Sequence, residues 1–216
     1  MLPPFEDRHQ AGVALARELT RLRHKCKWPA PIIVLALPRG GVPVAAPVAE
    51  ALSAPLDLMM VRKLGCPGHA ELAMGAVASG GVHFLNPHLI RQLGISQYQI
   101  EQALQQEQRE LARRENKYRH HRPPLALAGK TVILVDDGLA TGATMRVAIE
   151  ATLAHQPDRV LVAVPVGPAD TIAELAPLVS RVCCLATPHP FFSVGQWYRD
   201  FSQVEDAEVV ALMAGP

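Results

Sequence analysis

The chain has 216 residues, enough for one well-buried domain with additions or at most two small ones, and we expect one. Hydrophobic residues make up 49% of it and aromatic residues only 5%, so its core must consist mainly of Val, Leu, Ile and Ala, as in parallel sheets covered by helices. The 21 Lys and Arg residues balance 20 Asp and Glu residues, which argues against a broad basic face for nucleic acid and against an acidic tail.

Targeting signals and structural metals find no support in the sequence. The first eight residues carry charges where a secretory signal would need its apolar region. The longest run without Asp, Glu, Lys or Arg, residues 72–90, is interrupted by glycines and polar residues, so it predicts no membrane span. The four cysteines lack C-x-x-C spacing, which indicates reduced thiols and argues against a zinc site. We therefore expect a cytoplasmic protein with small-molecule partners that binds neither nucleic acid nor membranes.

The N-terminal part predicts a helix and then a strand that ends in a polar loop. Residues 7–24 have one apolar helical face, and we expect this helix to serve packing only. Residues 32–37 predict a buried strand, followed by the loop Pro-Arg-Gly-Gly at 38–41 and a helix over 42–53. The glycines allow the backbone to approach a ligand, and Arg39 can grip two phosphate oxygens. Taken alone, the loop is better explained as a βα turn with a surface arginine.

The next segment predicts a strand, a loop and a hairpin. Residues 56–61 form the expected strand, whereas residues 62–71 contain so much Gly, Pro and charge that we expect an irregular, mobile lid. Two short apolar runs at 73–78 and 82–85 predict a β-hairpin around Ser-Gly-Gly at 79–81.

An insertion at about 86–122 is expected to be helical, with a break at Gly94 and a new start at Ser96, which has capping-box spacing to Gln99. Its apolar stripe is thin, so it should lie on the surface. An exposed helix is the commoner explanation, with a dimer contact or a hinge arm as alternatives. The basic stretch 118–122 lacks interleaved aromatic residues, so we interpret it as a solvated linker rather than an RNA-binding segment.

The central segment, 132–144, carries the clearest chemical pattern. Its first four residues are an apolar, β-branched run typical of a strand buried on both faces, and a polar turn leads into a helix from Met145. Hydroxyls, backbone N–H groups and the positive end of the helix dipole would meet there and form a phosphate cradle. Its key residues are Thr141, Gly142 and Thr144.

Two acidic residues, Asp136 and Asp137, precede this cradle and would repel a phosphate, so they must face hydroxyls or a metal ion. The acidic pair and the cradle together fit a ribose 5-phosphate group, which carries hydroxyls at one end and a phosphate at the other. Neighbours on a strand point to opposite faces, so both carboxylates can reach one sugar only where the strand ends. The alternative is an ordinary βα turn with Asp and Thr as caps, which explains one or two of these residues but not the set.

The remaining segments alternate between helix and strand. We expect helices over 145–155 and 170–178 and strands over 159–164 and 181–185. This alternation predicts a Rossmann-like α/β fold, with a mostly parallel sheet flanked by helices and a site along the carboxyl ends of the strands. A single domain should span 1–216, with the helical insertion about 86–122 and a hood or tail about 187–216.

Half of the ten aromatic residues fall within the tail, before a final helix at about 204–213. Their flat faces suit stacking on a nucleobase-like ring, and closing the domain with a small C-terminal core is an equally good explanation. These residues are Phe191, Phe192, Trp197, Tyr198 and Phe201.

The central segment closely resembles the phosphoribosyl pyrophosphate (PRPP) signature of type I phosphoribosyltransferases. The resemblance implies that Asp136 and Asp137 hold the ribose hydroxyls, and Mg²⁺ directly or through ligand or water. It implies that the following residues hold the 5′-phosphate: Gly138, Leu139, Ala140, Thr141, Gly142, Ala143 and Thr144. Arg39, Gly40 and Gly41 would form the pyrophosphate loop. Arg62 and Lys63 match the start of the flexible loop of adenine phosphoribosyltransferases, and Glu71 falls near an acidic residue on its far side.

The activity implied is transfer of ribose 5-phosphate from PRPP to a nitrogenous acceptor by a homodimer of nucleotide metabolism. We expect the acceptor to be a nucleobase that Phe191, Phe192, Trp197 and Tyr198 contact. Hypoxanthine-guanine enzymes place an acidic residue where this chain has Ala140, which argues against a 6-oxopurine acceptor. Two alternatives remain open. One is a regulator that binds PRPP or a nucleotide without catalysis, and the other is transfer to a non-base acceptor or to water.

Overall fold

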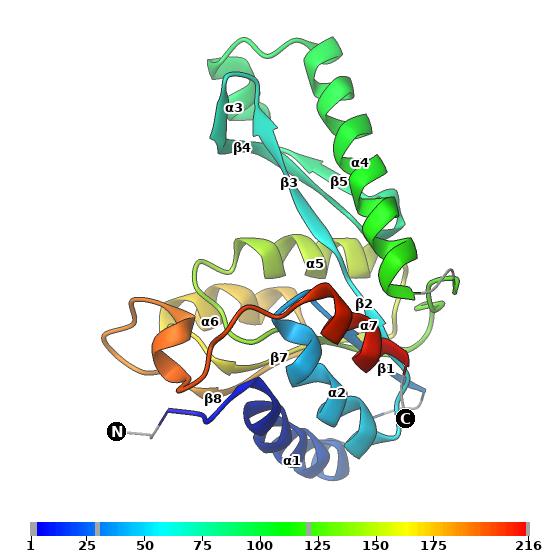
Figure 1. Ribbon diagram of the computed structural model, residues 1–216, viewed down its shortest axis with the longest axis vertical. Coiled ribbons are helices and arrows are strands. Elements are labelled where there is room, and N and C mark those ends of the chain that lie inside the picture. Colours follow the sequence, from blue (N-terminus) through cyan, green and yellow to red (C-terminus); the bar gives the residue numbers. More distant parts are fainter. Residues whose placement is uncertain (1–3, 29–30, 120–121, 215–216) are drawn as a thin grey trace.

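The computed structural model describes residues 4–28, 31–119 and 122–214, apart from the side chains of residues 70 and 71. Its core is a five-stranded sheet in which all neighbouring strands are parallel (Figure 1). The strand order is β2–β1–β6–β7–β8, with the bounds β1 (Ile32–Ala36), β2 (Leu56–Leu58), β6 (Thr131–Val135), β7 (Arg159–Val166) and β8 (Arg181–Ala186). This confirms the Rossmann-like fold class expected from the alternation of helices and strands.

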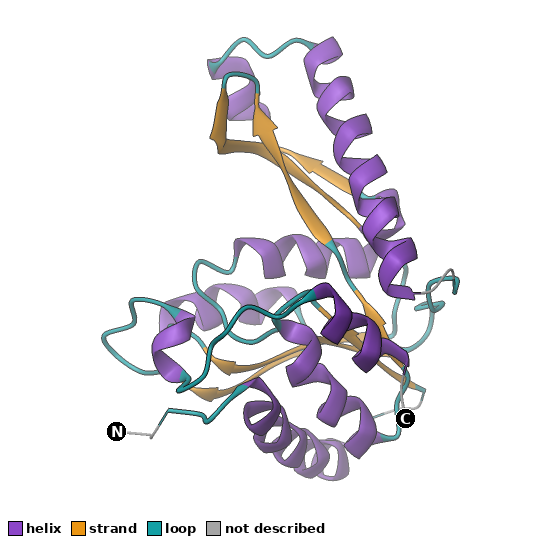
Figure 2. Ribbon diagram, viewed as in Figure 1, coloured by secondary structure: helices purple, strands orange, loops and turns teal. Residues whose placement is uncertain are grey.

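Helices cover both faces of this sheet (Figure 2). On one side lie α1 (Arg8–Cys26) and α2 (Gly41–Leu52), and on the other lie α5 (Ala143–Ala154) and α6 (Ala169–Leu175), which continues into the short η2 (Ala176–Leu178). Successive strand residues divide between the two layers, because side chains alternate across a strand. Val34 packs with the α1 and α2 side chains, whereas Ile33 and Leu35 pack with those of α5.

The register of the central strands brings two loops together. Ala36 at the end of β1 lies opposite Val135 at the end of β6, and the next amide, Leu37 N–H, donates to the Val135 carbonyl at 2.9 Å. Because parallel strands point the same way, the loops after them leave the sheet at one edge. Both loops with predicted chemistry are therefore neighbours.

A second unit, residues 61–119, projects from the core, and we call it the arm (Figure 1). It contains a three-stranded antiparallel sheet covered by helices. Its elements are β3 (Val61–Cys66), β4 (His69–Ala78), η1 (Ser79–Gly81), β5 (His83–Leu85), α3 (Pro87–Gln92) and α4 (Gln97–Arg119). The hairpin around 79–81 and the helix break near Gly94 are confirmed, and Gln99 and Ser96 form the expected reciprocal cap.

The prediction of an irregular lid over 62–71 is wrong, because most of this segment is the hairpin of β3 and β4. Its glycines do not interrupt the strands: Gly65 lies at a register shift, and Gly68, at φ 78°, belongs to the turn. Side chains alternate along β3, where Leu64 and Cys66 are buried and Lys63 is exposed. The strand predicted over 56–61 accordingly ends at Leu58, and Val61 already belongs to the arm.

The interpretation of 118–122 as a solvated linker is also wrong where the structure describes it. Tyr118 and Arg119 are buried at the end of α4. The Arg119 Nε atom donates to Asp57 of β2 at 2.7 Å, and its Nη1 atom lies 3.1 Å from Glu115. A positive charge that looked solvated in the sequence thus joins the arm to the edge of the core sheet.

The tail forms a small hydrophobic core over the N-terminal end of α1, separate from the cores on the two faces of the sheet. A small C-terminal core was one of the two explanations given for the aromatic residues of the tail. Tyr198 and Ala11 are buried there with Val166, beside the half-buried Phe191 and Trp197. Main-chain bonds run from Phe5 N–H to Trp197 and from Arg199 N–H back to Phe5, each 2.8 Å long. The tail contains η3 (Val194–Trp197) and ends in α7 (Asp206–Ala214).

The four cysteines are free, and burial raises the pKa of Cys183 to about 12 and that of Cys184 to about 11. These two thiols are therefore protonated near neutral pH and serve as filling of the last strand. Over the residues that the structure describes, no helix is both long enough and apolar enough to cross a membrane.

Candidate functional site

The loop after β1 lies against the two acidic residues that follow β6. A Cβ atom added to Gly40 would come 2.1 Å from Oδ2 of Asp137, and one added to Gly41 would come 3.2 Å from Oδ1 of Asp136. The two glycines are therefore needed for this close approach of the loop to the carboxylates. The structure thus brings together the two patterns that the sequence carries about 95 residues apart.

Each acidic side chain has one oxygen engaged and one available. Asp136 Oδ1 accepts from the Asp137 N–H at 2.9 Å, and Asp137 Oδ2 accepts from Arg8 Nε at 2.8 Å. Within the described part of the chain, Asp136 Oδ2 and Asp137 Oδ1 have no hydrogen-bond partner. Two single carboxylate oxygens are what two adjacent hydroxyls of one sugar require.

Burial sets the protonation behaviour of this pair. It raises the pKa of Asp136 well above its ordinary value, and the neighbouring charge of Asp137 adds to the rise. Burial also raises the pKa of Asp137, against the opposing effect of the Arg8 guanidinium. A cationic ligand or a hydroxyl donor at the two available oxygens would relieve this cost of burial.

Arg8 is a site residue that the sequence interpretation missed, because its helix was expected to serve packing only. It lies 129 positions from Asp137, and nothing in the helical pattern of 7–24 distinguishes it. The Tyr198 hydroxyl donates to the Asp137 carbonyl at 2.5 Å, so the tail also contacts this residue. Burial raises the pKa of Tyr198, which keeps the hydroxyl a donor.

The turn after the acids has the geometry of an anion cradle. Gly142, at φ 72°, is the N-cap of α5, and a Cβ there would lie 2.8 Å from the Thr171 side chain. The N–H groups of Thr141 and Gly142 have no partner among the described residues, and the first N–H groups of a helix lack intrahelical acceptors. Together with the exposed Thr141 and Thr144 hydroxyls, they can surround a phosphate.

The first part of the same turn has a supporting role. Leu139 is buried, and its N–H already donates to the Val166 carbonyl at 2.9 Å. Gly138 packs against the Val194 side chain, and a Cβ there would come 2.6 Å from it. The Ala140 carbonyl accepts from the Thr171 hydroxyl at 2.9 Å. These contacts hold the shape of the turn, so the donors of the cradle come from 141 onward.

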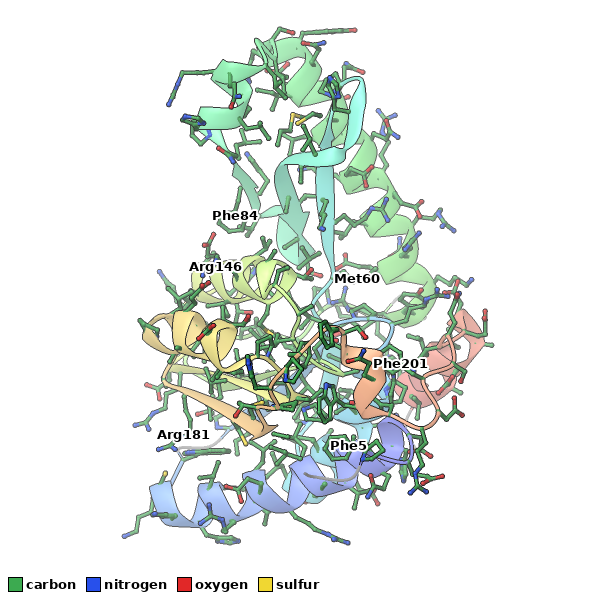
Figure 3. The ribbon with its side chains drawn as sticks, turned by 90° about the vertical axis from the view of Figure 1, so that its left-hand side faces the viewer. Phe5, Met60, Phe84, Arg146, Arg181 and Phe201 are labelled. Atoms are coloured by element: carbon green, nitrogen blue, oxygen red, sulfur yellow. The ribbon has the colours of Figure 1, made fainter. Side chains whose placement is uncertain are left out.

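Arg62 and Lys63 point to opposite faces of β3, as strand neighbours must. Lys63 lines a hollow of about 480 Å³ together with Thr141, Thr144 and Arg146, so it faces the cradle. Figure 3 shows Phe84 and Arg146, which also line this hollow, on the arm and on α5 respectively.

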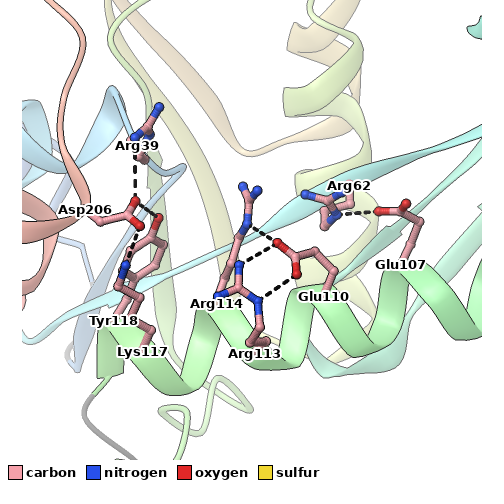
Figure 4. A network of polar contacts seen from close by, with 9 residues as sticks. All are labelled: Arg39, Arg62, Glu107, Glu110, Arg113, Arg114, Lys117, Tyr118 and Asp206. Atoms are coloured by element: carbon pink, nitrogen blue, oxygen red, sulfur yellow. Dashed lines mark hydrogen bonds and ion pairs between the residues drawn. The ribbon is translucent and has the colours of Figure 1, made fainter.

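Arg62 turns the other way, toward α4. Its guanidinium binds the Glu107 carboxylate, in the row of ion pairs that continues along α4 in Figure 4. The side chain of Glu71, the third charged residue predicted for this segment, lies outside the described residues.

Arg39 contacts the tail through Asp206, at the start of α7 (Figure 4). Its Nη1 atom lies 3.6 Å from Asp206 Oδ1, which also accepts from the Tyr118 hydroxyl at 2.6 Å. The other carboxylate oxygen accepts from Lys117 Nζ at 2.6 Å. These donors, Lys117 first, lower the pKa of Asp206 to about 2. One carboxylate therefore joins the loop after β1 to the end of the arm.

The aromatic residues of the tail differ in exposure. Phe191 stacks on Trp197 with ring centroids 6.5 Å apart, and Tyr198 is buried, whereas Phe192 is 77% exposed. The Trp197 Nε1 atom is buried without a hydrogen-bond partner among the described residues. Of the four residues predicted to stack on an acceptor, Phe192 alone is largely exposed.

The described residues include no group of three or more His, Cys, Asp or Glu side chains that could hold a metal ion by themselves. The two available oxygens of Asp136 and Asp137 nevertheless fit Mg²⁺, which usually keeps several waters and binds one or two carboxylates together with substrate phosphates.

The fold and this edge of its sheet define a class: α/β proteins with an acidic strand end beside an anion cradle at a helix N-terminus. The phosphoribosyl transferase domain model matches residues 7–195, so the chain belongs to that family.

Two relatives share most of this chain. "Putative phosphoribosyl transferase Rv0571c" of Mycobacterium tuberculosis (strain ATCC 25618 / H37Rv) is 45% identical over 209 residues, which are 97% of this chain and 46% of that protein. The chain thus spans about half the length of the curated relatives it matches. The crystal structure of TT1426 from Thermus thermophilus is 41% identical, with a TM-score of 0.82 and 97% of both chains covered.

A more distant structure shares the fold alone. It is that of a hypothetical protein from Neisseria gonorrhoeae with bound ppGpp, at 15% identity and a TM-score of 0.51, covering 98% of this chain and 95% of that one.

Proposed function

We propose that this protein transfers ribose 5-phosphate from PRPP to a nitrogenous acceptor and releases pyrophosphate. One observation carries the proposal: two carboxylates with one available oxygen each lie between a glycine loop and an anion cradle. In this proposal the carboxylates take the ribose hydroxyls, the glycine loop takes the pyrophosphate and the cradle takes the 5′-phosphate. Family membership supports the same assignment.

In the proposed reaction, the bond from C1′ to the pyrophosphate oxygen breaks and its electron pair leaves with the pyrophosphate. The acceptor nitrogen then forms the new bond to C1′ with its lone pair, and its proton passes to the released pyrophosphate or to solvent. Asp136 and Asp137 hold the ribose hydroxyls and favour positive charge on the ring, while Arg39 and Lys63 neutralise the departing group. When bound, Mg²⁺ would add further positive charge at the pyrophosphate.

Binding is the first test. We expect calorimetric titration with PRPP to show binding that strengthens with Mg²⁺. Pyrophosphate release should then depend on one member of a panel of nucleobases. Absence of binding to PRPP, ribose 5-phosphate and nucleotides alike would refute the proposal.

The acidic pair provides the matched variants. Asp137→Asn should abolish turnover and leave the fold intact, because the amide cannot replace both the ion pair with Arg8 and the acceptor for a hydroxyl. Asp158→Asn, which alters an exposed ion pair with Arg159, is the control and should keep full activity. Unchanged turnover of Asp137→Asn would remove the acids from the mechanism.

For the acceptor, we propose the exposed face of the tail, with Phe192 as the stacking residue beside Phe191 and Trp197. Phe192→Ala should raise the KM for the acceptor and leave the KM for PRPP unchanged. Leu153→Ala, which removes an exposed apolar side chain elsewhere, is its control. An equal effect of both variants would place the acceptor elsewhere.

A regulator that binds a nucleotide without catalysis is the second candidate, since Arg39 is already paired with Asp206 and a protein of the same fold was crystallised with ppGpp. The experiments above separate the two, because a regulator would bind PRPP or a nucleotide without releasing pyrophosphate. Release without any acceptor would instead indicate transfer to water. We also propose a homodimer, which light scattering during gel filtration tests directly.

A further inference from the structure

The acidic residue Asp137 is held from both ends of the chain. Its side chain binds Arg8, the first residue of α1, and its carbonyl binds Tyr198 of the tail. The Arg8 guanidinium also donates from Nη1 to the Ser202 carbonyl at 2.7 Å and lies 3.9 Å from the centre of the Phe201 ring. Three fixed contacts therefore define where this guanidinium lies.

We infer that Arg8 is a positioning residue for ribose binding: it fixes Asp137 so that one carboxylate oxygen faces the sugar. This inference rests on the proposed function, in which Asp137 binds a ribose hydroxyl. Arg8 itself need not touch the ligand. Its effect passes through the carboxylate that it orients and through the tail residues that it joins to that carboxylate.

Helix stability does not explain an arginine at this position. A cation in the first turn of a helix opposes the macrodipole, whose N-terminal end is positive. The cap of α1 is supplied by Asp7, which accepts from the Gln10 N–H at 2.7 Å, and needs nothing from Arg8. The Arg8 side chain therefore lies at the site at a small cost to its own helix.

Close packing explains why orientation matters. Asp137 Oδ2 lies 2.1 Å from the position that a Cβ of residue 40 would take, and Arg8 Nε lies 3.4 Å from that position. The side chains of Arg8 and Asp137 are only 11% and 15% exposed, so solvent cannot replace their bond readily. If Asp137 rotated, it would collide with the pyrophosphate loop or turn its available oxygen away from the ligand.

The test compares two ligands by calorimetry, ribose 5-phosphate and inorganic phosphate. Arg8→Met should weaken ribose 5-phosphate binding by about 10-fold to 100-fold, the range expected for a hydrogen bond to a charged group. Binding of inorganic phosphate at the cradle should stay unchanged, because Arg8 binds Asp137 and Ser202 and no hydrogen bond joins it to Thr141 or Gly142 among the described residues. Loss of both ligands together would mean a general structural role and would overturn the inference.

Two further variants sharpen the result. Arg8→Lys keeps the charge but cannot reach Asp137 and Ser202 with separate nitrogens, so a smaller loss is expected. Arg199→Met is the control, because Arg199 forms an exposed ion pair with Glu6 at the same junction of N-terminal segment and tail. An effect of Arg199→Met equal to that of Arg8→Met would overturn the inference.

A double-mutant cycle asks whether Arg8 acts through Asp137. In the Asp137→Asn background, Arg8→Met should cause no further loss of ribose 5-phosphate affinity. A full additional loss would show that Arg8 acts independently. If the wild-type protein binds neither ribose 5-phosphate nor PRPP, the proposed function itself fails. If it binds them and Arg8→Met binds equally well, only the role of Arg8 is refuted.

Discussion

The core sheet and the arm place their charged residues by different rules. In the core, Asp136 and Asp137 follow β6 directly and Arg39 lies in the loop after β1, so their location depends on where parallel strands end. In the arm, Arg62 and Lys63 lie within a strand, and the face that each occupies decides whether it meets α4 or the cradle. Strand ends therefore bring residues together at one edge, whereas strand interiors separate neighbours.

The ion pairs of α4 also differ in what they hold together. The buried pair of Arg119 and Asp57 joins the arm to the core. Along α4, the pairs of Glu110 with Arg113 and Arg114 are exposed and lie within one helix. The attachment of the arm thus depends on a few buried contacts, and the variants below test that difference from the largest expected effect to the smallest.

The largest effect should come from Arg119→Met. It leaves Asp57 buried without its cation, and breaking a buried pair costs about 3–5 kcal/mol of unfolding free energy. Urea denaturation measures this change. Arg113→Met is the matched control in the same helix and should leave the denaturation midpoint unchanged, since its partner is on the surface. Similar midpoints for both variants would refute the special role of the buried pair.

Gly40→Ala should come next, with about a 100-fold loss of turnover, the scale that a misplacement of roughly 1 Å can cause. The added methyl carbon would come 2.1 Å from Asp137 Oδ2 and force the carboxylate or the loop to move. Steady-state kinetics and PRPP binding report the loss, and thermal denaturation should show an intact fold. A fully active variant would mean that the close approach of loop and acid is unnecessary.

Lys63→Met and Arg62→Met compare the two faces of β3. We expect Lys63→Met to lower kcat by about tenfold or more, because it removes a charge that would face the departing pyrophosphate. Arg62→Met should leave kcat near the wild-type value, since the guanidinium binds Glu107 on the other face. If Arg62→Met lowered kcat more than Lys63→Met did, the arm would have to rotate on ligand binding so that the other face of β3 meets the cradle.

The smallest effect concerns Asp206 and pH. Its pKa is lowered to about 2 in the folded chain from an ordinary value of 3.8, so its contribution to stability is fully present above pH 4 and is lost as the pH falls toward 2. Asp206→Asn should therefore narrow the difference in unfolding free energy between pH 5 and pH 2.5, by a small amount because solvent screens a carboxylate that is 39% exposed. An identical pH dependence in both proteins would contradict this.

Much of the core could be predicted from local patterns. Continuous apolar runs predicted the parallel strands, and the polar turn after Asp137 predicted the start of the helix that the structure has as α5. The edge where the site lies followed from the alternation of strands and helices, because parallel topology leaves one choice. These features depend on neighbours in sequence.

The remaining features depend on partners distant in sequence. The strand β3 was missed because its glycines and charges outweighed an alternation that becomes evident only when α4 covers one face. Arg8 and Asp206 carry no local signal, since each is defined by a partner more than 80 positions away. Buried charge such as Arg119 likewise looks identical to surface charge until its partner is known.

The joining of the N-terminal segment to the tail has a consequence for how the protein acquires function during synthesis. The acids at 136 and 137 leave the ribosome before residues 198–202, which hold Asp137 through Tyr198 and secure Arg8 through Ser202. A nascent chain can therefore assemble its parallel sheet while Asp137, the residue proposed to bind the ribose, is not yet held by the tail. The proposed ribose site would then be completed late in synthesis, when the tail docks against Phe5 as the last step of assembly.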